Sequence, residues 1–125
     1  RRKMIYIDFG GTWCPPCLAE MEPLKELRKK YSPDDIAFIS ICRSDDRKRY
    51  EQILDKFKMH VPGIEHIYAN DLQAPDQVHK MYNQLNVVGL PHFLIINREG
   101  VIVNYGSMMR PSYPGTSECI EEWLE

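Results

Sequence analysis

Apolar residues recur along this chain with two different periods, and the shorter period marks strands. Compact runs of β-branched and aromatic residues fill a buried, pleated surface, so each such run predicts a strand. The runs are MIYIDF (4–9), IAFISIC (36–42), IEHIYA (64–69), HFLII (92–96) and VIVNY (101–105). The sequence Asn-Arg-Glu-Gly at 97–100 joins the last two runs and predicts a hairpin turn.

Between these runs, apolar residues return every three or four positions, which predicts helices with one buried face. The first helix carries Cys17 and is predicted to end near Tyr31, after the glycines at 10–11 have broken the preceding strand. The other helices are predicted to open at the Ser-Asp-Asp sequence 44–46, at Pro75 and at Thr116 or Ser117. Short polar residues cap free N–H groups at such openings, and proline suits a first turn.

The order of these elements favours an α/β fold with three layers. Strand, helix and strand at the start form a unit with parallel pairing, whereas the late hairpin adds antiparallel strands. Helices on both faces of such a mixed central sheet give an α/β/α arrangement. We expect a single domain over residues 1–125, excised from a longer precursor, because RRKMIYIDFG enters a strand almost at once.

Composition argues against several classes of function. Hydrophobic residues make up 43% and charged residues 27% of the chain, which is ordinary for a soluble globular protein. The net charge of −2 indicates no nucleic-acid partner, and no apolar run approaches the roughly 20 residues of a membrane span. Four cysteines are too few for a disulfide scaffold of this length. Cys42 and Cys119 are isolated and predicted to be buried free thiols, so only Cys14 and Cys17 are close in sequence.

The two cysteines of GTWCPPC have the placement of a redox pair. Residues three apart on a helix share one face, so the two sulfurs can bond to each other. Cys14 would lie at the exposed start of the helix, where free N–H groups and the helix dipole favour the thiolate, and Cys17 would be more shielded. We therefore expect Cys14 to attack a substrate disulfide and Cys17 to resolve the mixed disulfide.

The prolines between the cysteines refine this prediction. Pro15 and Pro16 fit a first helical turn, whose N–H groups have no helical partner. They also remove two donors from the Cys14 sulfur and leave mainly the N–H of Cys17. We expect the helix start to lower the pKa of the Cys14 thiol only modestly, which predicts a reducing couple rather than a strong oxidant.

Two other uses of the cysteine pair compete with disulfide exchange. A zinc site takes about four ligands, and the sequence offers no second close pair and no histidines at ligand spacing. A structural disulfide between Cys14 and Cys17 would close a very small loop and would constrain little of the unfolded chain. A CxxC motif next to a strand–helix–strand unit favours redox exchange over both.

Several stretches carry a family resemblance. The chain resembles the thioredoxin fold in YIDFGGTWCPPC and in VVGLPHFLIINREGVIV. In CLAEMEPLKEL and RPSYPG it is similar to the extracytoplasmic TlpA/ResA-like thiol-disulfide oxidoreductases, especially their Bacteroidetes-type members. The resemblance implies that Cys14 attacks, that Cys17 resolves and that the peptide before Pro91 is cis. It also implies that Leu90 offers its backbone to an extended substrate and that Trp13 lies beside the active site rather than in the core.

The resemblance further implies two acids near the cysteines. Asp8 has the position of a buried acid, where burial would raise the pKa of its carboxyl and let it relay a proton to or from Cys17. Glu20, three residues after Cys17, matches an acid of ResA-like members. Each could instead be solvated, Asp8 at a sheet edge and Glu20 on a helix surface. The sequence leaves open which acid relays protons.

Two residues depart from the family pattern. Pro23 falls six residues after Cys17, one later than is usual, so we expect a displaced helix kink. His92 follows Pro91 where threonine is common, and it either tunes the site or packs.

Together these inferences predict an enzyme that reduces protein disulfides outside the cytoplasm, in the periplasm or cell envelope, a location that rests on the resemblance alone. It would act as a monomer on protein thiols and disulfides, with an upstream electron donor, no metal, and no cofactor beyond the redox-active disulfide Cys14–Cys17. One rival is a cytosolic tryparedoxin- or nucleoredoxin-like reductant, since these share WCPPC. The other is a Cu(I)-binding chaperone that uses Cys14 and Cys17, with or without His92, because soft thiolates suit Cu(I).

Overall fold

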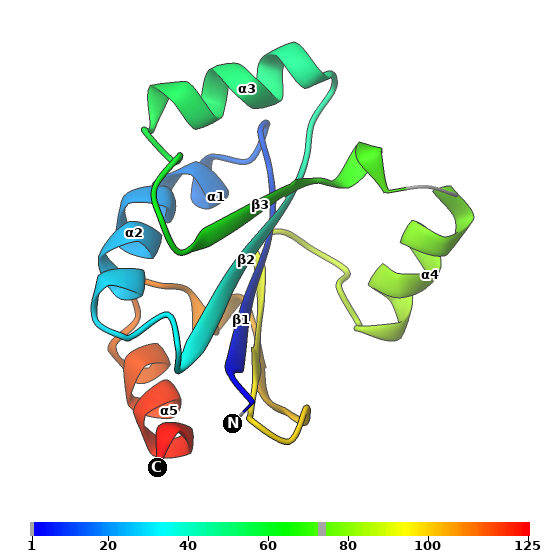
Figure 1. The fold of residues 1–125 in the computed structure, drawn as a ribbon. Coiled ribbons are helices and arrows are strands. Elements are labelled where there is room, and N and C mark those ends of the chain that lie inside the picture. Colours follow the sequence, from blue (N-terminus) through cyan, green and yellow to red (C-terminus); the bar gives the residue numbers. More distant parts are fainter. Residues whose placement is uncertain (1, 73–74) are drawn as a thin grey trace.

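The computed structural model describes residues 2–72 and 75–125, which form a five-stranded sheet with helices on both faces (Figure 1). The strands lie in the order β3-β2-β1-β4-β5. Their bounds are β1 Met4–Gly11, β2 Ile36–Arg43, β3 Ile64–Tyr68, β4 His92–Ile96 and β5 Ile102–Gly106. β1, β2 and β3 run parallel, and β4 is antiparallel to both of its neighbours, β1 and β5. The predicted mixed central sheet is confirmed.

The helices complete the three predicted layers. They are α1 Pro15–Ala19, α2 Met21–Lys29, α3 Arg47–Lys56, α4 Pro75–Gln84 and α5 Pro114–Leu124, with 3-10 turns η1 at Ala69–Asp71 and η2 at Ser107–Met109. α2, α3 and α5 cover one face of the sheet, and α4 covers the other (Figure 1). Within the described ranges, no helix is both long enough and apolar enough to cross a membrane.

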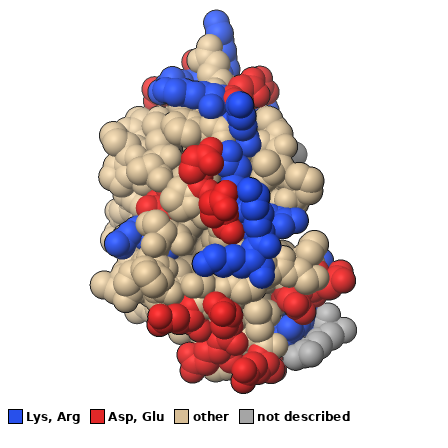
Figure 2. Space-filling view, turned by 90° about the vertical axis from the view of Figure 1, so that its left-hand side faces the viewer, with Lys and Arg blue, Asp and Glu red and all other residues tan. Residues whose placement is uncertain are grey.

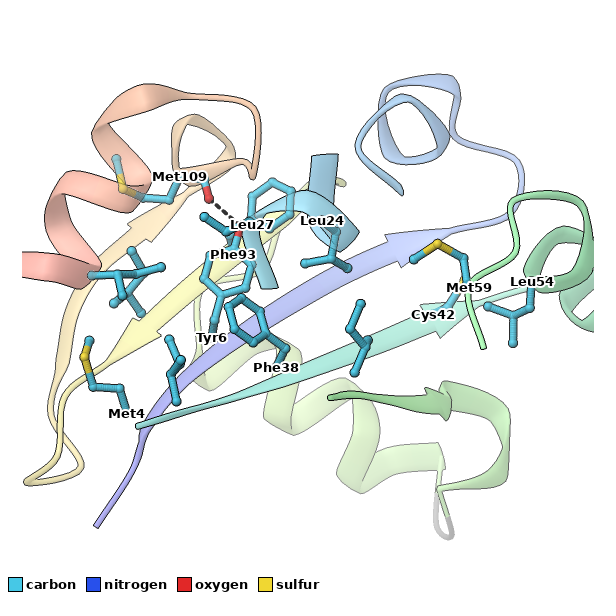
Figure 3. Close-up of a cluster of buried hydrophobic side chains, with 14 of the residues drawn as sticks. Met4, Tyr6, Leu24, Leu27, Phe38, Cys42, Leu54, Met59, Phe93 and Met109 are labelled. Carbon is cyan, nitrogen blue, oxygen red and sulfur yellow. Dashed lines mark hydrogen bonds between the residues drawn. The ribbon is translucent and has the colours of Figure 1, made fainter. Parts of the chain in front are cut away.

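The larger core lies between the sheet and α2, α3 and α5 (Figure 3). Tyr6 and Phe93 are fully buried at its centre, with ring centroids 5.9 Å apart, and Leu24 and Leu27 of α2 pack against the same cluster. Each side chain of this size stabilises the fold by roughly 1.5–3 kcal/mol through burial. A smaller core under α4 is centred on Phe9, and the two cores hold β1 between them.

The first predicted helix is in fact two helices. α1 ends at Ala19 and α2 begins at Met21, with Glu20 between them. Pro23 explains the interruption, because its nitrogen has no hydrogen to donate to the carbonyl of Ala19 and its ring clashes with that carbonyl. The kink expected from the displaced proline is therefore present, and it places Glu20 at a corner.

Two predicted boundaries were wrong. The glycines at 10–11 were expected to end the first strand, yet β1 continues through Gly11 because both glycines pair with β2. The last helix was expected to open at Thr116 or Ser117, yet α5 begins at Pro114, whose fixed backbone angle suits a first turn.

Charges of both signs lie on the face that α2, α3 and α5 form (Figure 2). Basic side chains run down its middle, over α2, and acidic side chains gather at its lower end, over α5 (Figure 2). α5 supplies Glu118, Glu121 and Glu122, which explains the acidic end. This end is opposite to the end of the sheet where β1 leads into α1 (Figure 1).

Candidate active site

The cysteine motif lies where β1 ends and α1 begins. Cys14 is the N-cap of α1 with extended backbone angles, and its sulfur accepts the N–H of Cys17 at 3.3 Å. Pro15 and Pro16 fill the first two helical positions, where no N–H partner is required. The expectation that the Cys17 N–H would be the remaining donor to Cys14 is confirmed.

Cys14 and Cys17 form a disulfide, with their Cα atoms 5.2 Å apart. The expected difference in shielding is absent, because each cysteine residue is 8% exposed. The bond accounts for this, since it draws the Cys14 sulfur in against the sulfur of Cys17. Trp13, immediately before the pair, is 54% exposed, so a core role for this ring was the wrong alternative.

Gly10 leaves a space that the carboxyl of Asp8 and the sulfur of Cys17 share. A Cβ atom at Gly10 would lie 3.7 Å from Asp8 Oδ1 and 3.8 Å from Cys17 Sγ. Asp8 and Gly10 point to the same face because strand residues two apart share a side. β1 is the central strand of the sheet, so the alternative of a solvated sheet edge for Asp8 was wrong.

The surroundings of Asp8 favour its protonated form. Burial, which disfavours the charged carboxylate, is the main cause that raises its pKa from 3.8 to about 7. The negative charge of Glu20 acts in the same direction, and a hydrogen bond from Ser40 Oγ at 3.4 Å acts against it. A carboxyl with a pKa near neutrality can both take up and return a proton under ordinary conditions.

Glu20 lies at the corner between α1 and α2 and is held by a residue far away in sequence. The backbone N–H of Ser112 donates to Oε1 at 2.9 Å, and the Ser112 hydroxyl donates to Oε2 at 2.8 Å. Glu20 is therefore not a freely solvated helical residue, and both of its oxygens are engaged with Ser112. The Asp8 carboxyl, by contrast, shares the space left by Gly10 with the Cys17 sulfur.

The peptide bond between Leu90 and Pro91 is cis, as the resemblance implied. It immediately precedes β4, whose first residue, His92, is opposite Phe9 near the end of β1. The antiparallel register thus brings the Leu90–Pro91 peptide to the end of the sheet where β1 leads into the cysteine motif.

His92 packs rather than faces the cysteines. Its ring lies 6.3 Å from that of Phe9 and 6.4 Å from that of Tyr105, between ring centroids, and the residue is 8% exposed. Phe9 belongs to the core under α4, whereas Asp8 and Gly10 face the other side of β1. Across 2–72 and 75–125, no three His, Cys, Asp or Glu residues are arranged to hold a metal ion, so the copper hypothesis lacks a third ligand there.

The two remaining cysteines are free thiols. Cys42 is buried beside Gly10 on β2, and the pKa of its thiol is raised to about 12, mainly by burial and further by the charge of Asp8. Cys119, on α5, is partly exposed, so the prediction of a buried thiol is confirmed only for Cys42.

A groove of about 420 Å³ lies beside Trp13, between the ends of β1 and β2 and helix α4. Its wall includes Arg43, whose guanidinium carbon lies 3.9 Å from the ring centroid of Tyr82. A hydrogen bond of 2.8 Å between the hydroxyls of Thr12 and Ser44 ties the loops after β1 and β2 together. The exposed indole of Trp13 is therefore carried by a loop that is fixed from two strands.

Sequence reasoning missed Ser40, Ser112 and the spacing role of Gly10. Ser40 gave a weak signal, as the one hydroxyl in the otherwise apolar run IAFISIC. Ser112 lies in RPSYPG, which was noticed for its family resemblance without a physical role. Neither could be placed near the cysteines without the strand register and the packing of the segment before α5.

A family model described as thioredoxin-like matches residues 2–102. The chain belongs to the thioredoxin-like family. This thioredoxin-like chain is similar to the thiol-disulfide oxidoreductase ResA of Geobacillus kaustophilus, with 28% identity over 127 residues, which covers 100% of this chain. The match covers 63% of that relative, so the chain spans less than two thirds of its length.

Two solved structures from Bacteroides vulgatus share the fold of this thioredoxin-like chain. One is the crystal structure of a candidate thiol-disulfide oxidoreductase, with 27% identity and a TM-score of 0.77, covering 98% of this chain and 79% of the other. The other is the solution structure of a candidate thiol-disulfide oxidoreductase, with 33% identity and a TM-score of 0.71, covering 99% and 75% of the two chains. The predicted ResA-like resemblance with Bacteroides neighbours is confirmed.

Proposed function

We propose that this chain is an enzyme that reduces protein disulfides by exchange at Cys14 and Cys17. The observation that carries the proposal is the disulfide at the start of α1, with the carboxyl of Asp8 facing the Cys17 sulfur across Gly10. A merely structural bridge has no need of a partly buried acid next to one of its sulfurs.

The reaction proceeds in two displacements, beginning with the reduced dithiol. The Cys14 thiolate attacks one sulfur of the substrate disulfide, so a Cys14–substrate bond forms, the substrate S–S bond breaks and the first substrate thiolate leaves. Cys17 then attacks the Cys14 sulfur, so the Cys14–Cys17 bond forms and the second substrate thiolate leaves. Two electrons pass to the substrate, whose thiolates take up protons.

Asp8 serves the second displacement as a general base. Its carboxylate accepts the proton of Cys17 and makes the attacking thiolate, and it returns the proton when the disulfide is reduced again. A pKa of about 7 suits this exchange, because both protonation states are then populated near neutral pH. An upstream dithiol donor restores the reduced pair by the same displacements in reverse.

The substrate binds as an extended segment at the end of the sheet. The backbone of Leu90, just before cis-Pro91, lies beside the start of β4 and offers main-chain groups for strand addition. Trp13 is 54% exposed and Val88 is 89% exposed, so apolar surface is available for the residues that flank the substrate cysteine.

We place this activity outside the cytoplasm, in the periplasm or cell envelope, in line with the motifs shared with TlpA/ResA-like proteins. Its partners are protein thiols and disulfides and an electron donor, and the unit that acts is a single domain over residues 1–125 and a monomer. The similarity to ResA over the whole of this chain supports the reaction class.

Replacement of Cys14 tests the proposal. Cys14→Ser should abolish the acceleration of insulin reduction by dithiothreitol, whereas Cys119→Ser, at a partly exposed free thiol on α5, should retain it. Insulin reduction by the Cys14→Ser variant at the unmodified rate would refute the proposed chemistry. Stoichiometric Cu(I) binding by the unmodified chain without turnover would favour the chaperone instead.

A further inference from the structure

The segment at 107–113, between β5 and α5, is anchored to the body of the protein by backbone carbonyls. The Tyr6 hydroxyl donates to the carbonyl oxygen of Met109 at 2.6 Å, within the larger core (Figure 3). The Thr116 hydroxyl donates to the carbonyl oxygen of Arg110 at 2.7 Å, and Thr116 is fully buried. These two bonds fix the segment on the face of the sheet that carries the redox site.

Ser112 makes the third attachment, which reaches Glu20, the C-cap of the helix α1 that contains Cys17. Its N–H and its hydroxyl donate to the two oxygens of Glu20, at 2.9 Å and 2.8 Å. Glu20 follows α1 directly, and its backbone is fixed because its N–H donates to the carbonyl of Cys17 at 3.2 Å. The Glu20 residue is thus held at its backbone by α1 and at its carboxylate by a segment 92 residues away.

The position of the Glu20 carboxylate matters because its charge acts on Asp8. Asp8 accepts a hydrogen bond from Ser40 and shares the space at Gly10 with Cys17. The titratable groups that interact with it through charge are Tyr6, Glu20, Cys42 and Tyr82. Burial is the first cause of the raised Asp8 pKa, and Glu20 is the charged group that adds to it. No Lys, Arg or His in the described chain is among the causes, so no cation offsets a movement of Glu20.

We propose that Ser112 is a positioning residue of the redox site, which acts on the proton exchange of Asp8 by fixing the position of the Glu20 carboxylate. Among the described residues, Ser112 makes no hydrogen bond to either sulfur or to Asp8, so its effect passes through Glu20. The role rests on the proposed function, in which Asp8 takes the Cys17 proton. The RPSYPG stretch then has a physical role, because it contains the serine that binds Glu20 at the corner between α1 and α2.

Release of Glu20 should lower the pKa of Asp8. A carboxylate that loses its hydroxyl partner turns toward water, away from a buried group of the same charge, and its repulsion on Asp8 weakens. The Ser112→Ala variant removes the hydroxyl donor and keeps the backbone donor. Glu20→Gln removes the charge, and Ser112→Thr restores a hydroxyl.

The experiment is a titration of the Asp8 carboxyl carbon by NMR in the oxidised protein. We expect the midpoint to shift to lower pH in Glu20→Gln, to shift in the same direction by less in Ser112→Ala, and to return in Ser112→Thr. In the Glu20→Gln background, Ser112→Ala should give no added shift. Ser117→Ala is the matched control, because the Ser117 hydroxyl donates to the carbonyl oxygen of Pro114 within α5, at 3.2 Å. The Asp8 midpoint should not move in this variant.

An Asp8 midpoint that is the same in Ser112→Ala and in the unmodified chain would overturn the proposal, and so would a shift that persists when Glu20 is already glutamine. The titration needs no turnover. It therefore reports on Ser112 whether or not the chain reduces insulin, and absence of insulin reduction bears on the proposed function alone.

Discussion

The two faces of β1 hold opposite kinds of environment, although they belong to the same strand. On the side of α1 and α2, Asp8 lies among polar and titratable groups and shares a space with Cys17. On the side of α4, Phe9 is fully buried in an apolar core and makes an edge-on contact with Tyr82, with ring centroids 5.2 Å apart. Alternation along a strand therefore separates proton chemistry from packing within the width of one residue.

The difference between the two faces of β1 explains how this strand can carry a partly buried acid. The desolvation of Asp8 costs stability, as its raised pKa shows. Packing of Phe9 on the opposite face offsets that cost without placing apolar bulk near the sulfurs. Replacing Phe9 should therefore change the stability of the protein, whereas replacing Asp8 should change how that stability depends on pH.

The largest effect should come from the packing side. Phe9→Ala empties a fully buried site and should lower the free energy of unfolding by about 3–5 kcal/mol, measured by urea denaturation. The equilibrium of the Cys14–Cys17 disulfide with dithiothreitol should stay the same, because Phe9 faces away from it. Val88→Ala, at an 89% exposed position, is the control and should cost less than about 0.5 kcal/mol. A shifted redox equilibrium in Phe9→Ala would break the separation of the two faces.

The chemical side should show itself in the dependence of stability on pH. The folded-state pKa of Asp8, about 7, exceeds its unfolded value of 3.8, so the folded state binds this proton more tightly. The contribution of Asp8 to folding stability is thus greatest below pH 3.8 and is lost as the pH rises toward about 7. This loss amounts to at most about 4 kcal/mol.

Urea denaturation of the oxidised protein at about pH 5 and about pH 8 measures this loss. Asp8→Asn has no carboxyl to ionise, so its stability should fall less between the two conditions than that of the unmodified chain. Equal losses in the two proteins would mean that Asp8 ionises as freely in the folded state as in the unfolded one.

The smallest effect should come from His92, which belongs to the packing side. Its Nε2 is buried without a hydrogen-bond partner in the described chain, so His92→Phe should leave stability unchanged or raise it by about 1 kcal/mol near neutral pH. Burial lowers the pKa of His92, so acidification should destabilise the unmodified chain relative to the variant. Thermal unfolding of the two proteins at neutral and at acidic pH measures this difference in stability. A stability loss in the variant at neutral pH would assign His92 a polar role that the packing does not show.

Much of the fold was predictable because its signals are local. The runs at 36–42 and 92–96 contain enough β-branched and aromatic residues to define strands alone, and Asp46 caps α3 as the sequence indicated. The cysteine pair and the cis peptide at Pro91 were likewise predictable, because each depends on neighbouring residues of a specific motif.

The rest of the site depends on contacts that no local pattern encodes. The bond from Ser40 to Asp8 requires the parallel register of β1 and β2, which a slip of one residue would reverse. The attachment of Ser112 to Glu20 joins positions 92 residues apart in sequence, on a helix corner that exists because of Pro23. Sequence could indicate that two acids lie near the sulfurs, but not that one of them is held by a serine.

Cys42 is a buried free thiol on β2, the strand next to β1. It lies opposite Gly10 on the neighbouring strand, so a spare thiol stands next to the place where disulfides would be made and broken. Scrambling requires an ionised sulfur, and a thiol with a pKa of about 12 is almost never ionised at neutral pH. Burial, with a smaller contribution from the charge of Asp8, therefore keeps the Cys42 thiol protonated, so under the proposed function this thiol would not exchange with the Cys14–Cys17 pair.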